Sequence, residues 1–228
     1  MNENQNQEDK KGKLSANKPF VLLISAQLIS NVGDWLHLLA LLTMVGLKWN
    51  ATPWEITALS LCMALPMMLG GPIAGYLSDR FNRKALMIGS DLARAGIVAG
   101  LIFVDSLWQV YLLLLVKGIM DVLFSPAKTG KLKELVPQEQ MDGAVALSSS
   151  IEQITKIIGP ALGGLLVAGF GISVCYLIDS VTFVVSAIIL FGLPRYGAFK
   201  QNILDQNEST RKERQSFRHE MAAGFRII

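Results

Sequence analysis

Six long apolar stretches, separated by short connections, limit most strongly what this chain can fold into. They are residues 20–47, 56–77, 85–104, 107–124, 144–170 and 172–193. An α-helix needs about 20 mostly apolar residues to cross the hydrocarbon core of a bilayer, and each stretch is close to that length or longer. Charged residues make up only 17% of the chain, against about 25% in an average soluble domain. We therefore predict an all-α membrane protein with six transmembrane helices.

The connections alternate between basic and nearly neutral. Residues 48–55, 105–106 and 169–173 carry almost no Lys or Arg, whereas most of the 21 basic residues fall in the other connections and in the two terminal segments. Because basic connections stay in the cytoplasm, this alternation predicts cytoplasmic N and C termini. We expect a multi-pass protein of the cell (plasma) membrane.

Three regions follow from this pattern. Residues 1–18 are polar and predict a disordered cytoplasmic tail, and residues 19–194 form the six-span unit. Residues 195–228 predict a cytoplasmic linker that carries an amphipathic helix. In that linker Phe217, Met221 and Phe225 recur every four residues, which places them on one helical face.

A short internal repeat links the second and fifth spans. "GPIAGYL" (71–77) and "GPALGGL" (159–165) share the pattern G-P-x-x-G-x-L. These spans run in opposite directions, so the chain reads as two inverted three-helix repeats, an arrangement typical of transporters. Gly and Pro also recur in membrane helices for ordinary packing, and that reading stays open. On either reading we assign helix packing to six residues: Gly71, Pro72, Gly159, Pro160, Gly163 and Gly164.

Three pairs of opposite charges fall inside the predicted spans at helical spacing. The pairs are Asp91 with Arg94, Lys117 with Asp121, and Glu152 with Lys156. A lone charge at the bilayer centre costs about 2.5–3.5 kcal/mol on insertion scales, so such residues are expected to pair and to face the bundle interior. The pairs either tie helices together or line a pathway for a proton or substrate.

The first span carries a single acidic residue, Asp34, which follows two interruptions of the apolar run at Asn31 and Gly33. A rise of 1.5 Å per residue from Phe20 places Asp34 about 20 Å into the span. A carboxyl group at that depth could carry a proton or contact a substrate, and we group Asp34 and Asn31 with the pathway residues. The alternative is a carboxylate that is hydrogen-bonded near the outer interface.

Several other classes of function find no support. Cys62 and Cys175 lie in separate apolar runs, and His37 and His219 are far apart, so we expect no metal and no cofactor. No H-E-x-x-H or G-x-S-x-G motif is present, and we expect no enzymatic activity. A channel is disfavoured because the TVGYG filter sequence is absent, and a net charge of only +3 argues against nucleic acid.

The hairpin between the second and third spans carries a specific order of residues, "GYLSDRFNRK" (75–84). This order resembles the signature loop of the major facilitator superfamily, G-x-L-x-D-R-x-G-R-K/R, which lies at the same position. The matching residues are Gly75, Asp79, Arg80, Arg83 and Lys84. Asn82 stands where Gly is usual, and we expect the turn to survive because Asn tolerates positive φ. The resemblance implies a conformational latch, for which Asp121 is the expected local partner of Arg80 or Arg83.

Further stretches are similar to the macrolide-efflux-type branch of that superfamily, which contains drug:proton antiporters. They are "NVGDWL" (31–36), "DLARA" (91–95), "FSPAKTGKLKELVP" (124–137) and "IGPALGG" (158–164). Thr155 and Ala146 replace earlier Gly positions of the antiporter motif in the fifth span. The resemblance implies a secondary transporter that exports an amphipathic, drug-like molecule by alternating access, with the proton as coupling ion.

The resemblance covers the N-terminal six-helix half of a twelve-span family. We therefore expect the chain to be truncated before a seventh span and to work with a missing C-terminal six-helix half. Its other partners would be the lipid bilayer and a small-molecule solute. An inactive or structural fragment is the alternative, and a six-span half that works as a dimer is a third reading.

Overall fold

The computed structural model describes residues 14–194, and every regular element in that range is helical. The long helices are α2 (Lys18–Thr43), α3 (Pro53–Arg80), α4 (Arg83–Gly100), α5 (Leu107–Leu135), α6 (Met141–Phe170) and α7 (Ile172–Phe191). Short elements are η1 (Leu14–Ala16), η2 (Met44–Lys48), η3 (Leu101–Phe103) and η4 (Gln138–Gln140). The six long helices are apolar enough to cross a membrane, η2 and η3 extending α2 and α4, which confirms the predicted fold class.

Local sequence signals set several helix starts. Asn17 caps α2 by accepting a hydrogen bond from the Phe20 amide, and Thr52 and Glu55 form a reciprocal capping box at the start of α3. Asn82 caps α4 in the same way, with φ −66°, and its side chain accepts from the Ala85 amide. The turn therefore needs no positive φ at Asn82, because this residue serves as a helix cap. Gly171, at φ 86°, makes the turn between α6 and α7.

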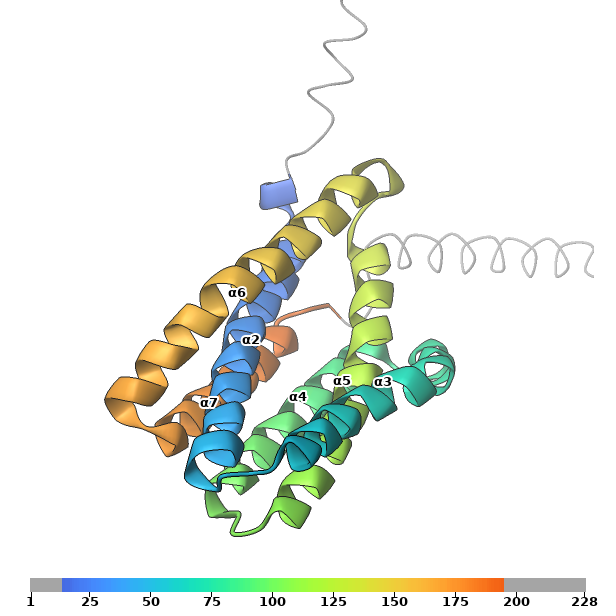
Figure 1. The fold of residues 1–228 in the computed structure, drawn as a ribbon. Coiled ribbons are helices and arrows are strands. Elements are labelled where there is room, and N and C mark those ends of the chain that lie inside the picture. The colour runs from blue at the N-terminus through green and yellow to red at the C-terminus, as the bar shows by residue number, and fades with distance from the viewer. Residues whose placement is uncertain (1–13, 195–228) are drawn as a thin grey trace, which may run out of the picture.

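The six helices form two side-by-side groups, as Figure 1 shows. In one group α2 packs against α6 and α7, and in the other α5 packs against α3 and α4. Contact between α4 and α7 joins the groups. Exchanging α2 with α5, α3 with α6 and α4 with α7 maps the contacts within one group onto those within the other and leaves the α4–α7 contact unchanged. This pattern fits two three-helix repeats that trade their first helices.

Two apolar clusters lie at opposite ends of the bundle. One contains Phe20, Met87 and Leu135, and the other contains Leu41, Val110 and Tyr176. At the first end, the Asn17 amide group donates to the Leu135 carbonyl (2.8 Å) and Lys84 Nζ donates to the Leu193 carbonyl (2.6 Å). The basic hairpin, the start of α2, the α5–α6 connection and the end of α7 therefore meet at one end of the molecule.

The ends of the helices differ from the predicted spans most clearly in α5. We expected that span to end at residue 124, where Pro126 and several Lys residues follow, but α5 continues to Leu135. At 1.5 Å per residue its 29 residues span about 43 Å, well beyond a hydrocarbon core of about 30 Å. Asp121 consequently lies near the middle of α5 and not at its basic end.

The predicted terminal regions are only partly covered. Within the predicted 1–18 tail, Leu14–Ala16 form the 3-10 turn η1 and Lys18 is the first residue of α2. Residues 1–13 and the predicted linker with its amphipathic helix, 195–228, lie outside the described residues.

The contact between α2 and α6 depends on a missing side chain at Gly159. A Cβ at Gly159 would overlap the Trp35 side chain, whereas a Cβ at Gly71 would meet nothing within 4 Å among the described residues. We expect Gly159→Ala to lower the free energy of unfolding by about 1–3 kcal/mol, the usual cost of overpacking.

The matched control is Gly71→Ala, which we expect to be neutral or stabilising by up to about 1 kcal/mol, because Ala is the better helix former. Thermal unfolding of the purified chain in detergent, followed by circular dichroism, measures both. Equal stability of the two variants would contradict the close approach of α2 and α6 at this point.

Candidate functional site

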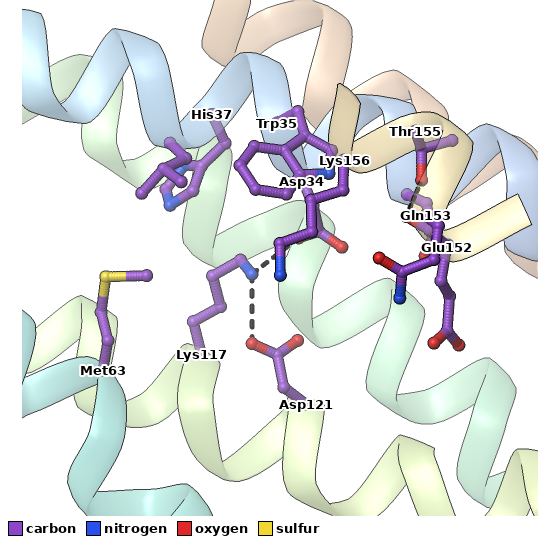
Figure 2. A pocket seen from close by; sticks show the side chains of 12 residues that line it. Asp34, Trp35, His37, Met63, Lys117, Asp121, Glu152, Gln153, Thr155 and Lys156 are labelled. Carbon is purple, nitrogen blue, oxygen red and sulfur yellow. Dashed lines mark hydrogen bonds and ion pairs between the residues drawn. The ribbon is translucent and has the colours of Figure 1, made fainter. Parts of the chain in front are cut away.

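A polar cavity of about 490 Å³ opens between α2, α3, α5 and α6 (Figure 2). Most of the predicted pathway residues line it together. They are Asn31 and Asp34 on α2, Lys117 on α5, and Glu152 and Lys156 on α6. Asp121 lines it as well, and Trp35, His37 and Met63 complete the wall beside them. The cavity lies between the two apolar end clusters, so its charged groups are concentrated in the middle of the bundle.

Lys117 is the centre of the charges in this cavity. Its Nζ lies 2.9 Å from Asp34 Oδ1 and 3.1 Å from Asp121 Oδ2, and these two ion pairs are drawn in Figure 2. The Lys117 side chain is only 9% exposed, while those of Asp34 and Asp121 are 34% and 40% exposed. A buried cation therefore holds two carboxylates that remain accessible from the cavity, one on α2 and one on its own helix.

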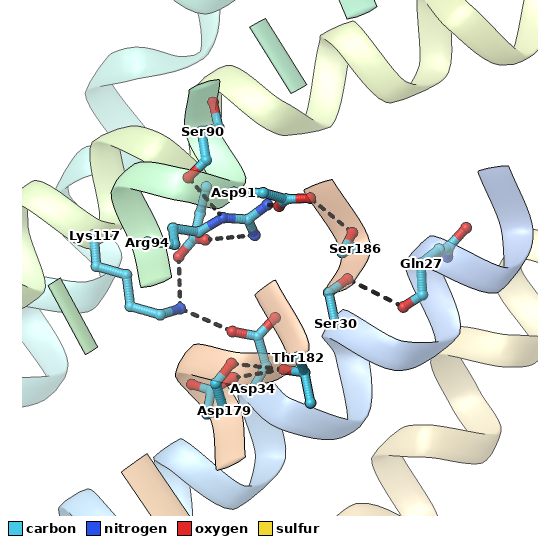
Figure 3. Close-up of polar contacts among 11 residues, drawn as sticks. Gln27, Ser30, Asp34, Ser90, Asp91, Arg94, Lys117, Asp179, Thr182 and Ser186 are labelled. Atoms are coloured by element: carbon cyan, nitrogen blue, oxygen red, sulfur yellow. Dashed lines mark hydrogen bonds and ion pairs between the residues drawn. The ribbon is translucent and has the colours of Figure 1, made fainter. Parts of the chain in front are cut away.

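Arg94 extends this network away from the cavity and into the protein (Figure 3). Its guanidinium pairs with Asp121 Oδ1 at 3.1 Å and with the fully buried carboxylate of Asp91. The second oxygen of Asp91 accepts a hydrogen bond from Ser186 Oγ (2.7 Å) on α7. Phe124 and Phe183 lie against the guanidinium, and their ring centroids are 4.4 and 4.5 Å from Arg94 Cζ. Arg94 thus connects α4, α5 and α7 behind the cavity wall.

Glu152 makes different contacts from those that its spacing predicts. Its carboxylate pairs with Lys128 Nζ on α5 at 2.7 Å and accepts a hydrogen bond from Gln27 Nε2 on α2 at 3.0 Å. Lys156 is exposed on the cavity wall and forms no ion pair with any residue between 14 and 194. The predicted Glu152–Lys156 pair is therefore absent from this range, and Glu152 instead links three helices.

The signature hairpin lies at the basic end of the bundle, away from the cavity. Arg83 Nη2 pairs with Asp79 (3.0 Å), and Arg83 Nη1 pairs with Glu134 on α5 (3.1 Å) and donates to the Gly130 carbonyl (3.1 Å). Lys84 Nζ donates to the carbonyls of Phe191 and Leu193, at the end of α7. The hairpin therefore fastens α3 and α4 to α5 and α7.

Asp121 does not contact this hairpin. Its carboxylate is used by Arg94 and Lys117, and the α5 partner of Arg83 is Glu134, more than three turns further along the helix. Arg80 donates to the Tyr76 hydroxyl (2.8 Å). The expected pairing of Asp121 with Arg80 or Arg83 is therefore wrong. The predicted span ended at residue 124, which put Asp121 near the basic end, whereas α5 continues to Leu135.

The predicted packing residues divide into two sets. Gly159 and Gly163 are buried against α2, where a Cβ at Gly163 would lie 3.1 Å from that of Leu39. A Cβ at Gly164 would lie 4.0 Å from Cδ1 of the same leucine, and Pro160 lies half-buried between these glycines. The copy of the motif on α3 packs less closely. Gly71 and Pro72 are exposed, and a Cβ at Gly71 or Gly75 would meet nothing within 4 Å among residues 14–194.

Sequence reasoning missed one pair beside the cavity, His37 on α2 and Asp179 on α7. His37 Nδ1 lies 4.0 Å from Asp179 Oδ2, and the two side chains are 2% and 0% exposed. From the sequence, His37 serves only as evidence against a metal site, and no role is predicted for Asp179. Positions so far apart in sequence carry no spacing signal, and only the packing of α2 on α7 brings them together.

The cavity can bind and orient a polar or charged solute, but its residues do not form an arrangement typical of making or breaking covalent bonds. Among residues 14–194, no group of three or more His, Cys, Asp or Glu is placed to hold a metal ion. Two accessible carboxylates, the buried Lys117 and the aromatic side chain of Trp35 provide charge and apolar surface side by side. This combination suits an amphipathic ligand.

Comparisons of the sequence with known proteins point to one family. The profile of the Major Facilitator Superfamily matches residues 23–225. The chain is 45% identical over 193 residues to "Uncharacterized MFS-type transporter YfiS" of Bacillus subtilis, covering 85% of this chain and 46% of YfiS. It is 31% identical over 180 residues to "Macrolide efflux protein A" of Enterococcus faecalis, covering 76% of this chain and 53% of that protein. It is 28% identical over 199 residues to "Putative bacilysin exporter BacE" of Bacillus amyloliquefaciens, covering 86% and 48%.

The chain thus spans about half the length of the curated relatives it matches. The match covers all six membrane-spanning helices, the hairpin and the cavity. The chain belongs to the Major Facilitator Superfamily.

Proposed function

We propose that this chain supplies one six-helix half of a secondary transporter that exports an amphipathic small molecule in exchange for protons. The observation that carries the proposal is the central cavity, where Asp34 and Asp121 face a solute-sized space and share the buried Lys117. Efflux proteins among the relatives support export over uptake. Secondary transporters place their substrate and coupling-ion sites near the membrane midplane, and a charged cavity between two apolar ends fits that position.

The open side of the cavity would face a second six-helix half. Many large apolar side chains are exposed on the helices beside it, such as Met67 on α3 and Ile157 on α6, 77% and 76% exposed. Lipid and the second half together would cover them. In this arrangement the solute site is shared, and the hairpin latch formed by Gly75, Asp79, Arg80, Arg83 and Lys84 would act against that other half.

The export assay uses everted membrane vesicles from cells that produce the chain together with the part of YfiS that it does not cover. Ethidium and a radiolabelled macrolide are the probes, and respiration acidifies the vesicle interior. We expect both halves together to accumulate a probe, and a protonophore to abolish the accumulation. The same vesicles carrying Asp34→Asn should accumulate less.

The outcomes separate the alternatives. Accumulation that a protonophore does not change would contradict proton coupling while keeping transport. No accumulation of either probe, with both halves present in the membrane, would favour an inactive or structural half and count against the proposed export.

We further propose that the basic end, and with it both termini, faces the cytoplasm of a cell-membrane protein. Lys133 and Lys48 are both exposed and lie on opposite ends of the bundle. In intact cells, an impermeant maleimide should label Lys48→Cys and should label Lys133→Cys only after the membrane is permeabilised.

Both cysteine variants are made in a Cys62→Ser/Cys175→Ser background, because the two native cysteines would otherwise contribute to the signal. Labelling of Lys133→Cys in intact cells, with Lys48→Cys protected, would invert the topology.

A further inference from the structure

His37 and Asp179 form a buried pair with unused hydrogen-bonding capacity. Within residues 14–194, both ring nitrogens of His37 and Oδ2 of Asp179 are buried without a hydrogen-bond partner. The other oxygen of Asp179 accepts from Thr182 Oγ1 at 3.3 Å. Figure 3 shows Asp179 and Thr182 on α7 next to Asp34 on α2. Since buried polar groups are nearly always satisfied, three unused atoms at one point require an explanation.

The space at this point is too small for a solute. A Cβ at Gly33 would overlap both Thr182 Oγ1 and Asp179 Oδ1, so α2 and α7 are in close contact here. His37 nevertheless lines the polar cavity, while Asp179 lies behind it. His37 is thus the cavity-lining residue through which a proton can reach the buried carboxylate of Asp179.

A single added proton neutralises the pair. Added to a neutral ring and a carboxylate, it places an N–H or O–H between His37 Nδ1 and Asp179 Oδ2, and a movement of about 1 Å closes their 4.0 Å gap to a hydrogen bond, while Nε2 keeps no partner among residues 14–194. Without the added proton, the charge of the carboxylate would stay buried beside a neutral ring, which is unfavourable. A second proton would leave a cationic ring beside a neutral acid. The pair is therefore built to hold one proton.

The charges of the cavity act on this pair. Asp34 on α2, Lys117 on α5 and Arg94 on α4 are the charged groups that interact electrostatically with Asp179, and Asp34 and Lys117 also act on His37. On α7 the titratable Tyr176 lies against His37, with ring centroids 5.6 Å apart. On α6, Glu152 and Lys156 face the cavity. A solute that displaces Lys117 from Asp34 would change the field at the pair.

We propose that His37 and Asp179 together bind the proton that this transporter exchanges for its solute, with the Asp34–Lys117 ion pair linking proton and solute sites. The exchange rests on the proposed transport function, whereas proton binding by the pair does not. The proton enters through the cavity to His37 Nδ1, is shared with Asp179 Oδ2, and leaves by the same ring when the cavity opens to the other side of the membrane.

The chain contains only two histidines, which permits a direct test. In a His219→Gln background, ¹⁵N-labelled histidine reports on His37 alone. The ring ¹⁵N shifts are followed by NMR from acid to alkaline pH for the full chain in detergent micelles. We expect Asp179→Asn to move the titration midpoint of His37 by about one pH unit or more, a tenfold change in proton affinity, or to alter whether it titrates at all.

The matched control is Asp105→Asn, an exposed carboxylate in the connection between η3 and α5, which should leave the His37 curve unchanged. Thr182→Val keeps Asp179 and removes the hydroxyl that donates to it, so it should also shift the His37 curve. This variant provides the test if Asp179→Asn does not fold. Identical His37 curves in the parent and in whichever of these two α7 variants folds would overturn the proposal.

Export measurements separate this proposal from the proposed function. In the two-half vesicles, Asp179→Asn and His37→Gln should uncouple probe movement from the proton gradient, so that a protonophore no longer changes that movement. If the parent exports nothing, the NMR result still decides whether the pair shares a proton. If the parent exports with proton coupling and both variants remain coupled, the proposed function stands and this assignment falls.

Discussion

Replacing Arg94 with methionine should destabilise the chain more than any other single substitution in the charge network. Arg94 is 4% exposed, and it is the cation paired with Asp91, which is fully buried. Removing one partner of a buried ion pair leaves an uncompensated charge, and such changes cost about 3–5 kcal/mol. The Phe124 and Phe183 rings would also lose their cation. Thermal unfolding in detergent, followed by circular dichroism, measures the loss.

Two further variants show whether the lost charge is responsible. Asp91→Asn combined with Arg94→Met removes both charges, and we expect it to recover at least half of the stability lost by Arg94→Met alone. Arg80→Met is the matched control, since Arg80 is exposed and its side chain donates a hydrogen bond to the Tyr76 hydroxyl; its effect should stay within about 0.5 kcal/mol. A double variant no more stable than Arg94→Met would mean that packing of the arginine, and not its charge, is what matters.

Replacing Lys117 with methionine should have the largest effect on transport. Among residues 14–194, Lys117 is the one residue paired with both Asp34 and Asp121, and the substitution would leave two carboxylates facing one cavity without their shared cation. We expect the lost ion pairs to raise the barrier of the transport cycle by about 2 kcal/mol, which corresponds to roughly a 30-fold lower initial export rate. The vesicle assay with both halves present measures this rate.

The effect of Lys117→Met on stability should be smaller than that of Arg94→Met, because Asp34 and Asp121 are 34% and 40% exposed and water can solvate them. Lys117→Arg keeps the charge and should retain part of the export. Lys133→Met, at the exposed end of the same helix, should export normally. An export rate for Lys117→Met close to that of Lys133→Met would remove Lys117 from the solute pathway.

Sequence spacing predicted contacts within helices far better than contacts between them. The pairs Asp91–Arg94 and Lys117–Asp121 form as expected, since residues three and four apart share a helical face. The same spacing failed for Glu152 and Lys156, because Glu152 meets Lys128 and Gln27 from two other helices. Spacing identifies a face, but it does not reveal which helix packs against that face.

Contacts between helices depend on small residues whose meaning is visible only in three dimensions. Gly33 allows α2 to approach Asp179, and Gly130 allows the Arg83 guanidinium to lie over α5. Hydropathy predicted the six helices, but it could not place the end of α5, because the helix continues beyond its apolar part on polar residues. That error moved Asp121 to the wrong end and gave Arg83 the wrong partner.

The exchange of first helices between the two repeats has a consequence for biosynthesis. Neither α2–α4 nor α5–α7 contains the neighbours that its own helices need, since α2 packs on α6 and α7 while α3 and α4 pack on α5. When the ribosome has delivered only the first three helices, Arg94 still lacks Asp121 and α2 has neither of its main partners. The translocon or lipid must shelter these early helices until the sixth emerges, so assembly waits for the end of the unit and cannot proceed one repeat at a time.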